Sequence, residues 1–171
     1  MKLAKVAFLD RDGVINKNKI NKGYIGKIKD FKWIRGAKRT IQLLNKKNFK
    51  VVVVTNQSGV ARGYFKIEDV KKLHLFIQKK LKKINAKIDK FYFCPYHIDG
   101  VVKKYKKNTS LRKPGIGMFK LAKKKWKIDL KNSFMIGDQS SDMEFAKRAQ
   151  IKGYLFKQEN LLNFLINKRI L

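Results

Sequence analysis

The sequence has little cysteine and no long apolar run, and each absence narrows the possibilities. Cys94 is the only cysteine among 171 residues, which excludes an internal disulfide and makes a cytoplasmic location the default expectation. No apolar run approaches the roughly 18 residues of a membrane span, and the N-terminus lacks the apolar region and cleavage site of a signal peptide. We therefore expect no membrane partner. The length and the 44% of hydrophobic residues predict a single domain, residues 1–171.

Acidic residues are also scarce, with 12 Asp and Glu against 43 Lys and Arg and a net charge of +31. A field of this size attracts nucleic acid or anionic membranes. However, only seven of the basic residues are Arg and the lysines are spread along the whole chain, whereas nucleic-acid-binding surfaces favour Arg in clustered patches. The charge therefore fits a lysine-rich background composition or a highly anionic small substrate. A nucleic-acid partner stays the less favoured alternative.

Against this background, two carboxylates follow the first apolar run. Residues 6–9, Val-Ala-Phe-Leu, predict a short buried strand that ends in Asp10 and Asp12, and Gly13 lets the chain turn away. The two carboxylates project to the same side if the strand continues, where they repel each other unless a cation lies between them. Ligands bind at this end of strands in open α/β sheets, which makes the motif a candidate Mg²⁺ and phosphate site.

Further strands and helices alternate along the chain. Strands are expected over 51–54, 88–93, 134–136 and 152–156, and helices over 37–44, 67–84, 116–126, 140–148 and 161–166, with Ser140 or Ser141 as the cap of the fourth helix. The alternation predicts a Rossmann-like three-layer α/β sandwich around a central parallel sheet, with little room for a separate cap domain. His74 has no ligand-type residue one helical turn away and is expected to be structural. The segment 94–113 is expected to be a long irregular loop.

Three of the predicted strands end in polar groups that suit phosphoryl chemistry. Besides Asp10 and Asp12, these are Thr55 and Asn56 after the second strand and Asp138 after the fourth. Right-handed crossovers bring such ends to one edge of the sheet, where a carboxylate can attack phosphorus and Mg²⁺ offsets the repulsion between the two anions. Each motif alone is weak, because Asp-x-Asp-Gly also occurs in turns and calcium loops. An EF-hand is excluded, since residues 17–22 supply no further acidic ligand.

Taken together, the ordered motifs resemble those of the haloacid dehalogenase (HAD) superfamily of phosphatases. They are similar to the D-glycero-D-manno-heptose 1,7-bisphosphate phosphatase family, which shares them with the histidinol-phosphatase domain. The residues that carry the resemblance are Leu9 to Asn16, Thr55 to Gly63, Arg112 to Gly115 and Gly137 to Met143.

The resemblance implies a role for each matching residue. Asp10 would be the nucleophile and a Mg²⁺ ligand, Asp12 the general acid and base with its backbone carbonyl on Mg²⁺, and Asp138 the other carboxylate on Mg²⁺. Thr55 and Lys113 would stabilise the phosphoryl group. Asp142 would brace Lys113 or the metal shell, or interact with the helix dipole. Substrate contacts are expected from Arg11, Gly23, Tyr24, Asn56, Gln57, Ser58, Arg112 and Gln139.

Two departures from the family pattern affect cofactor and substrate. Many members hold structural zinc through Cys-Pro-His and a later Cys-x-Cys, whereas this chain has Tyr96 after Cys94-Pro95 and Thr109 to Leu111 in place of the second motif. Cys94 and His97 cannot supply four ligands, so structural Zn²⁺ is not expected. Gln139 stands where the family often has Lys or Arg, which removes a cation near the substrate. The segment between Asn16 and Gly23 is slightly longer than usual.

The sequence therefore predicts an Mg²⁺-dependent, monomeric phosphatase that acts on a small phosphorylated sugar. A heptose bisphosphate, used for lipopolysaccharide or another heptose-containing glycan, is the first expectation. The alternatives are histidinol phosphate as substrate and, from the charge, a nucleic-acid-binding protein or a polynucleotide end phosphatase.

Overall fold

The computed structural model describes residues 3–18 and 23–171. Its strands are β1 (Val6–Leu9), β2 (Lys50–Asn56), β3 (Lys90–Cys94), β4 (Phe134–Gly137) and β5 (Lys152–Leu155). All five pair in parallel in one sheet with the order β3-β2-β1-β4-β5. The strand that carries the first motif is therefore central, with a strand on each side. The predicted parallel α/β architecture is confirmed.

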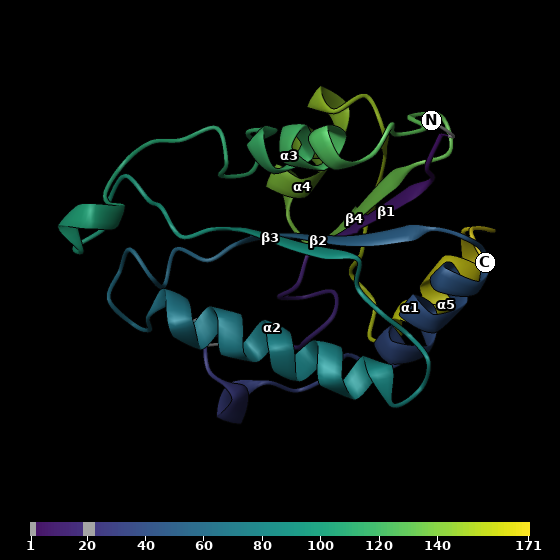
Figure 1. The fold of residues 1–171 in the computed structure, drawn as a ribbon, viewed down its shortest axis with the longest axis horizontal. Coiled ribbons are helices and arrows are strands. Elements are labelled where there is room, and N and C mark those ends of the chain that lie inside the picture. The colour runs from purple at the N-terminus through teal and green to yellow at the C-terminus, as the bar shows by residue number, and fades with distance from the viewer. Residues whose placement is uncertain (1–2, 19–22) are drawn as a thin grey trace.

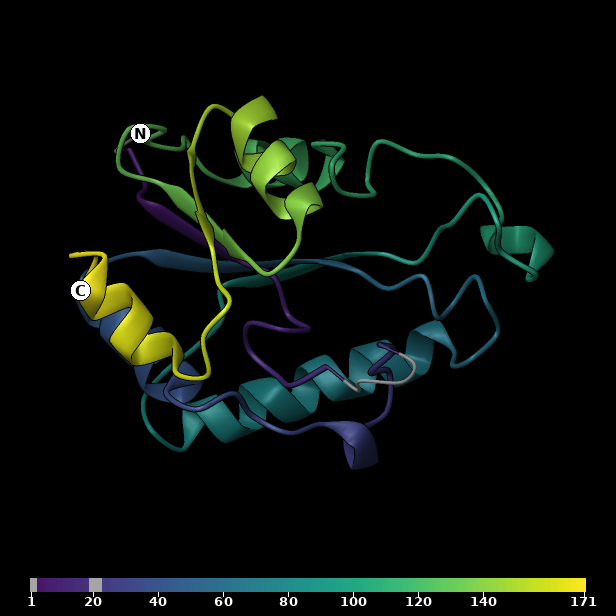
Figure 2. The ribbon, with the colours of Figure 1, turned by 180° about the vertical axis from the view of Figure 1, so that it is seen from behind.

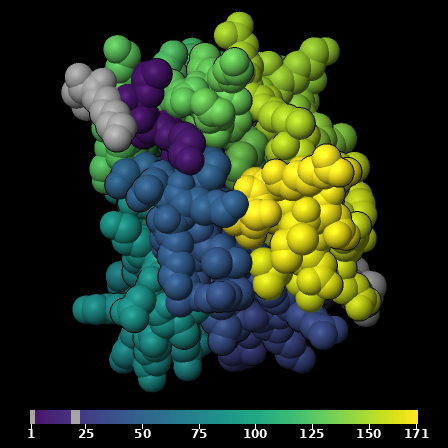
Figure 3. All heavy atoms as spheres, turned by 90° about the vertical axis from the view of Figure 1, so that its right-hand side faces the viewer, coloured from purple at the N-terminus to yellow at the C-terminus, as the bar shows by residue number. Residues whose placement is uncertain are grey.

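Helices cover both faces of this sheet. They are α1 (Ala37–Lys46), α2 (Ile67–Lys82), α3 (Gly117–Lys125), α4 (Ser140–Arg148) and α5 (Leu161–Asn167). Figure 1 shows α3 and α4 on one face of the sheet and α1, α2 and α5 on the other. Seen from the side in Figure 3, α5 lies directly beside α1. The chain thus forms the three expected layers.

The apolar strands explain the layers, because neighbouring residues of a strand face opposite sides. Phe8 and Val52 pack with α3 and α4, whereas Leu9 and Val53 pack with α1, α2 and α5. All four side chains are fully buried. The run of β-branched residues 51–54 suits a strand that is covered on both faces. The two apolar cores hold the carboxyl ends of β1, β2 and β4 in fixed positions.

Some local expectations differ from the structure. The helix α4 begins at Ser140 and is preceded by Gln139, whose backbone N–H donates to the Asp142 carboxylate, so neither Ser140 nor Ser141 is the cap. Two short 3₁₀ helices, η1 (Ile28–Asp30) and η2 (Lys103–Tyr105), were not expected. The predicted longer segment between 16 and 23 lies partly outside the described residues, because 19–22 are not described.

The segment between β3 and α3 is long and largely irregular, as expected. Figure 2 shows it extending away from the sheet with η2 at its far end. It returns to the sheet at residues 112–115, before α3 begins. In the described part of the chain, no helix is long and apolar enough to cross a membrane.

Candidate active site

The polar strand ends meet at one cavity of about 400 Å³. Its lining includes ten of the thirteen residues predicted for the site, namely Asp10, Asp12, Gly23, Thr55, Asn56, Ser58, Arg112, Lys113, Asp138 and Gln139, together with Asp142. Asn18, Ser140 and Ser141 complete the lining. The predicted contacts Arg11, Tyr24 and Gln57 lie outside it.

 Gln139, the residue that departs from the family pattern, thus lines the same cavity as the residues that match it.

A buried lysine lies between two of the carboxylates. Lys113 Nζ is 3.0 Å from Oδ1 of Asp10 and 2.5 Å from Oδ1 of Asp142, and its side chain is 2% exposed. Burial lowers the pKa of Lys113, but the Asp10 and Asp142 carboxylates outweigh it and raise the pKa above its ordinary value. The ammonium group is thus held in its charged form beside Asp10.

For Asp10, in contrast to Lys113, the effect of burial on the pKa is larger than the effect of the oppositely charged neighbour. Burial raises the pKa of Asp10 to about 7, Lys113 acts against this shift, and the carboxylates of Asp142, Asp12 and Asp138 add to it. Both contacts to Asp10 from Lys113 Nζ and from the backbone N–H of Arg11 use Oδ1. The carboxylate is therefore fixed through one oxygen, and the charge that burial disfavours calls for a further cation.

The cavity offers a position for that cation. Oxygens of Asp10, Asp138 and Asp142 lie within 4.8 Å of one another. Asp142 has both oxygens engaged, by Lys113 and by the backbone N–H of Gln139 at 3.0 Å. Oδ1 of Asp138, in contrast, is buried and has no hydrogen-bond partner among the described residues. Burial also raises the pKa of Asp138. A cation between Asp10 and Asp138 would satisfy both, so the predicted carboxylate ligands fit a metal.

Gly13 is required by the same geometry. It has a φ of +87°, and a Cβ at this position would lie 2.2 Å from Oδ2 of Asp138. Any side chain would therefore displace the carboxylate that we expect to bind the metal. The glycine of the motif allows both the turn after β1 and the approach of β4.

The carboxylate of Asp12 is held by hydrogen-bond donors and is not part of the group of carboxylates that could bind the cation. Its carboxylate accepts hydrogen bonds from Nε and Nη2 of Arg11 at 3.1 and 3.0 Å, from Asn16 Nδ2 at 2.9 Å and from Gln57 Nε2 at 2.8 Å. Arg11 is fully buried and Gln57 is 2% exposed. Neither residue is in the lining of the cavity, and the predicted substrate contacts of the two stay predictions. Arg11 and Gln57 orient Asp12 from beneath.

The residues after β2 also have positions that the motif alone does not reveal. The amide of Asn56 donates to the backbone carbonyl of Lys113 at 3.1 Å and accepts from its backbone N–H at 3.0 Å. Thr55 Oγ1 accepts from Gln57 Nε2 at 2.9 Å. Asn56 thereby fixes the backbone that carries Lys113, and Thr55 and Ser58 reach the cavity.

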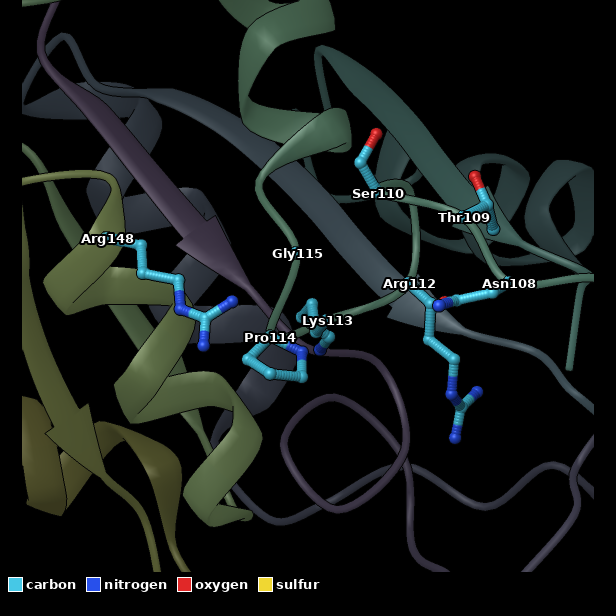
Figure 4. Close-up of a pocket in the computed structure, with 8 residues that line it drawn as sticks. All are labelled: Asn108, Thr109, Ser110, Arg112, Lys113, Pro114, Gly115 and Arg148. Carbon is cyan, nitrogen blue, oxygen red and sulfur yellow. The ribbon is translucent and has the colours of Figure 1, made fainter. Parts of the chain in front are cut away.

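Two predicted contacts on the rim differ in orientation. Arg112 lines the cavity, and its Nη1 is buried without a hydrogen-bond partner among the described residues. Figure 4 shows its side chain pointing in the opposite direction to those of Thr109 and Ser110. Tyr24 packs against Tyr64, with ring centroids 4.9 Å apart, and its predicted substrate contact stays a prediction. The rim therefore presents one guanidinium with an open hydrogen-bonding site.

The far side of the same segment forms a second hollow, of about 610 Å³. It is lined by residues 108–110 and 112–115 and by Arg148 of α4 (Figure 4). Arg148 already pairs with Glu144 at 2.8 Å. This hollow shares Arg112 and Lys113 with the site, but none of the strand-end carboxylates lines it.

The long segment 94–113 is held by contacts with its own residues and with the loop after β2. The backbone N–H groups of Val101 and Val102 donate to the carbonyl of Ala61 at 2.8 and 2.9 Å. Lys107 Nζ lies 4.1 Å from the ring centre of Tyr96. Cys94 is buried, and its Sγ is 3.8 Å from the carbonyl oxygen of Tyr96. These contacts fix the segment that delivers Arg112 and Lys113.

Sequence reasoning assigned no role to two asparagines that touch the site. Asn16 donates to Asp12, and Asn18 Nδ2 lies 3.3 Å from Oδ2 of Asp138. Asn16 belongs to the first motif, four residues after Asp12, and this short separation was the available signal. Asn18 lies beyond the motif, in a loop whose course the sequence does not reveal.

A cavity with a buried Lys–Asp pair, a second anchored carboxylate and a cation position can carry out phosphoryl transfer. Comparisons with known proteins agree with this chemistry. A family model described as polynucleotide kinase 3 phosphatase matches residues 5–159. The D-glycero-beta-D-manno-heptose-1,7-bisphosphate 7-phosphatase of Rhodopseudomonas palustris is 43% identical over 155 residues, which cover 91% of this chain and 84% of that protein. The D-glycero-alpha-D-manno-heptose-1,7-bisphosphate 7-phosphatase of Campylobacter jejuni is 39% identical over 181 residues. The match covers 97% of this chain and 98% of that protein.

Solved structures show the same fold. A HAD-like phosphatase from Mesorhizobium loti has 33% sequence identity and a TM-score of 0.82, with 92% of this chain and 74% of that chain covered. The D,D-heptose 1,7-bisphosphate phosphatase from B. bronchiseptica, complexed with magnesium and phosphate, has 26% identity and a TM-score of 0.80, with 96% and 86% covered.

Proposed function

Because this chain belongs to the polynucleotide kinase 3 phosphatase family of HAD-type phosphatases, we propose that it removes the 7-phosphate from D-glycero-D-manno-heptose 1,7-bisphosphate. It is a phosphoric monoester hydrolase. The observation that carries the substrate proposal is the identity of 38–43% to relatives with this named activity, together with the intact Asp10, Asp12, Lys113 and Asp138 at one cavity.

In the proposed reaction, Asp10 attacks the phosphorus of the 7-phosphate. A bond forms between a carboxylate oxygen of Asp10 and phosphorus, and the bond from phosphorus to the sugar oxygen breaks. The sugar oxygen takes a proton from the Asp12 carboxyl group, so a neutral sugar hydroxyl leaves. Lys113 lies 3.0 Å from Asp10 and lowers the charge repulsion between nucleophile and substrate.

In the second half-reaction, the Asp12 carboxylate removes a proton from water. The water oxygen attacks phosphorus, and the bond between phosphorus and Asp10 breaks, which releases inorganic phosphate and restores both carboxyl groups to their starting forms. In this proposal the hydroxyl of Thr55 donates to a phosphoryl oxygen, which is supported by Oγ1 accepting from Gln57 and so keeping its own proton available.

We infer that Mg²⁺ is the metal and that Asp10 and Asp138 hold it, with the backbone carbonyl of Asp12 as a further ligand. Mg²⁺ favours one or two carboxylates plus phosphate oxygens and water. When bound, it supplies positive charge that offsets the anionic phosphoryl group. The observation that supports this assignment is Oδ1 of Asp138, which has no hydrogen-bond partner in the described part of the chain.

Two other functions remain as alternatives to be tested. Histidinol phosphate is a monoester that the same residues could hydrolyse. A phosphate at the end of a nucleic acid fits the net charge of +31 and the description of the matching family model. The predictions of a cytoplasmic, monomeric enzyme also stay predictions.

A side-by-side assay separates these functions. The wild-type protein is given both anomers of the heptose 1,7-bisphosphate, histidinol phosphate and a 3′-phosphorylated oligonucleotide, each with Mg²⁺ and with a chelator. We expect a kcat/KM for one heptose anomer at least about tenfold above the other substrates, and no turnover with the chelator. If histidinol phosphate or the oligonucleotide is turned over faster, the heptose proposal is wrong.

A further inference from the structure

A histidine that the mechanism does not use lies buried beneath the site. His74, in α2, is 6% exposed, and its Nε2 is 3.2 Å from Nη1 of Arg11. Its ring stacks on Phe91, with ring centroids 4.4 Å apart and an interplanar angle of 16°. The sequence predicted a structural role for His74. Its contact with Arg11 connects it to the general acid and base.

The protonation of His74 follows from its partner. A guanidinium group only donates hydrogen bonds, so Nε2 of His74 must accept, and the ring proton must be on Nδ1. Burial, with the charge of Arg11 as a further cause, lowers the pKa of His74 to about 2. The ring is therefore neutral and keeps its acceptor near neutral pH.

Arg11 in turn contacts Asp12 with its other nitrogens. Nε and Nη2 donate to the Asp12 carboxylate, and Nη2 also contacts Gln57 Oε1 at 3.1 Å and the carbonyl of Ile25. Nη1 is the nitrogen that faces His74. Each edge of the guanidinium thus has its own acceptor, and the orientation of the group is fixed by contacts on three sides.

We propose that His74 is a positioning residue, which acts through Arg11 to hold Asp12 in the orientation needed for proton transfer. This inference rests on the proposed function, because Asp12 must face first the leaving oxygen and then water. Without an acceptor at position 74, Nη1 would be a buried donor with no partner, which is costly. The guanidinium would turn toward other acceptors and move the Asp12 carboxylate with it.

The test compares two substitutions at His74. His74→Phe keeps a flat ring to stack on Phe91 but removes the acceptor, whereas His74→Gln places an amide oxygen near the position of Nε2. We expect His74→Phe to lower kcat on the order of 10- to 100-fold with little change in KM, and His74→Gln to restore most of the loss. Leu73→Ala, a buried change in the same helix, is the control that lowers stability without touching Arg11.

All rates are normalised to the folded fraction, measured by circular dichroism. A double-mutant cycle with Arg11→Lys gives a second readout. If His74 acts through Arg11, adding His74→Phe to Arg11→Lys should cause no further loss of kcat. If His74→Phe does not fold, His74→Asn replaces it, because its short amide reaches only the position of Nδ1.

The outcomes are distinct. The inference is wrong if His74→Phe keeps the kcat of the Leu73→Ala control, if the Gln variant is as slow as the Phe variant, or if the two losses multiply in the cycle. A wild-type protein without turnover on any phosphate monoester rejects the proposed function instead. Wild-type turnover with an unaffected His74→Phe variant rejects this inference alone.

Discussion

The ammonium group of Lys113 lies 2.5 Å from Oδ1 of Asp142, and neither side chain is more than 2% exposed. The two residues come from different elements: Lys113 precedes α3, and Asp142 is in the first turn of α4. Of the roles considered for Asp142, the structure therefore shows the brace on Lys113. Its second oxygen accepts from the backbone N–H of Gln139, so it also ties α4 to the end of β4.

Replacing Asp142 should impair both stability and turnover. Asp142→Asn leaves Lys113 with Asp10 as its remaining counter-ion, and we expect a loss of about 1–3 kcal/mol in the free energy of unfolding and a lower kcat. Urea unfolding and steady-state kinetics measure the two effects. Glu144→Gln, in the same helix but on its exposed face, should change neither. Equal effects of the two substitutions would contradict the brace.

Asp10→Asn should abolish turnover and leave the fold intact, because the amide cannot attack phosphorus.

The same substitution, Asp10→Asn, should also change the pH dependence of stability. In the folded, metal-free protein Asp10 keeps its proton up to a pH of about 7, whereas its ordinary pKa is 3.8. The wild type therefore loses stability relative to Asp10→Asn as the pH rises from about 4 to about 7, by at most about 1.4 kcal/mol per pH unit. Unfolding in a chelator at several pH values measures this difference, and a constant difference would contradict the assigned burial.

The elements that the sequence predicted are those with an unambiguous apolar period. The four valines of 51–54 predict a buried strand, and the apolar face of α2 predicts a helix. The third strand was less well placed: Ile88 is apolar and buried, yet the strand begins at Lys90, because Asp89 turns its carboxylate to the backbone N–H of Val51. Apolar character alone does not distinguish a buried loop residue from the first residue of a strand.

For the site, the sequence placed the strand ends correctly but not all of the side chains beside them. Asp10 and Asp12 were expected on one side because the side-chain period of a strand is two. The same rule directs Arg11 to the opposite side, toward His74, so the contact of Arg11 with α2 could have been inferred from the strand period. The positions of Tyr24 and Gln57 depend on loop contacts with Tyr64 and Asp12, which have no local signature.

Mg²⁺ binding should weaken as the pH falls below about 7. Burial raises the pKa of Asp10 to about 7 and also raises the pKa of Asp138, so both carboxylates compete for protons in the metal-free protein. Metal binding must displace these protons. Calorimetric titration in two buffers of different ionisation enthalpy should detect proton release near pH 6 and less release near pH 8. Pure pH independence of the affinity would contradict the proposed ligands.

The purified protein should hold no stoichiometric zinc. Cys94 is buried beside the carbonyl of Tyr96, and the long segment is held by the contacts of Val101 and Val102 with Ala61. Cys94→Ala should therefore cost only about 1 kcal/mol and keep the wild-type kcat. Elemental analysis and thermal unfolding check this. One zinc per chain, lost together with stability in Cys94→Ala, is the contrary outcome.

Arg112 should determine how well the substrate binds. Its Nη1 is buried at the rim of the cavity and has no hydrogen-bond partner within residues 3–18 and 23–171, and a guanidinium in that state suits the second phosphate or the hydroxyls of a sugar. We expect Arg112→Ala to lower kcat/KM for the heptose bisphosphate by about 10- to 100-fold, mainly through KM, and to affect a small aryl phosphate much less.

Arg148→Ala is the matched control for Arg112, because Arg148 lines the hollow behind the same segment and pairs with Glu144. Each variant loses one positive charge, but only Arg112→Ala also loses the expected contact with the substrate. Since the chain has a net charge of +31, long-range attraction of an anionic substrate should change little in either. Equal losses in both variants would mean that general charge, and not the contact of Arg112, sets the affinity. A loss confined to Arg112→Ala and to substrates with a second polar group would place the distal part of the sugar at this guanidinium.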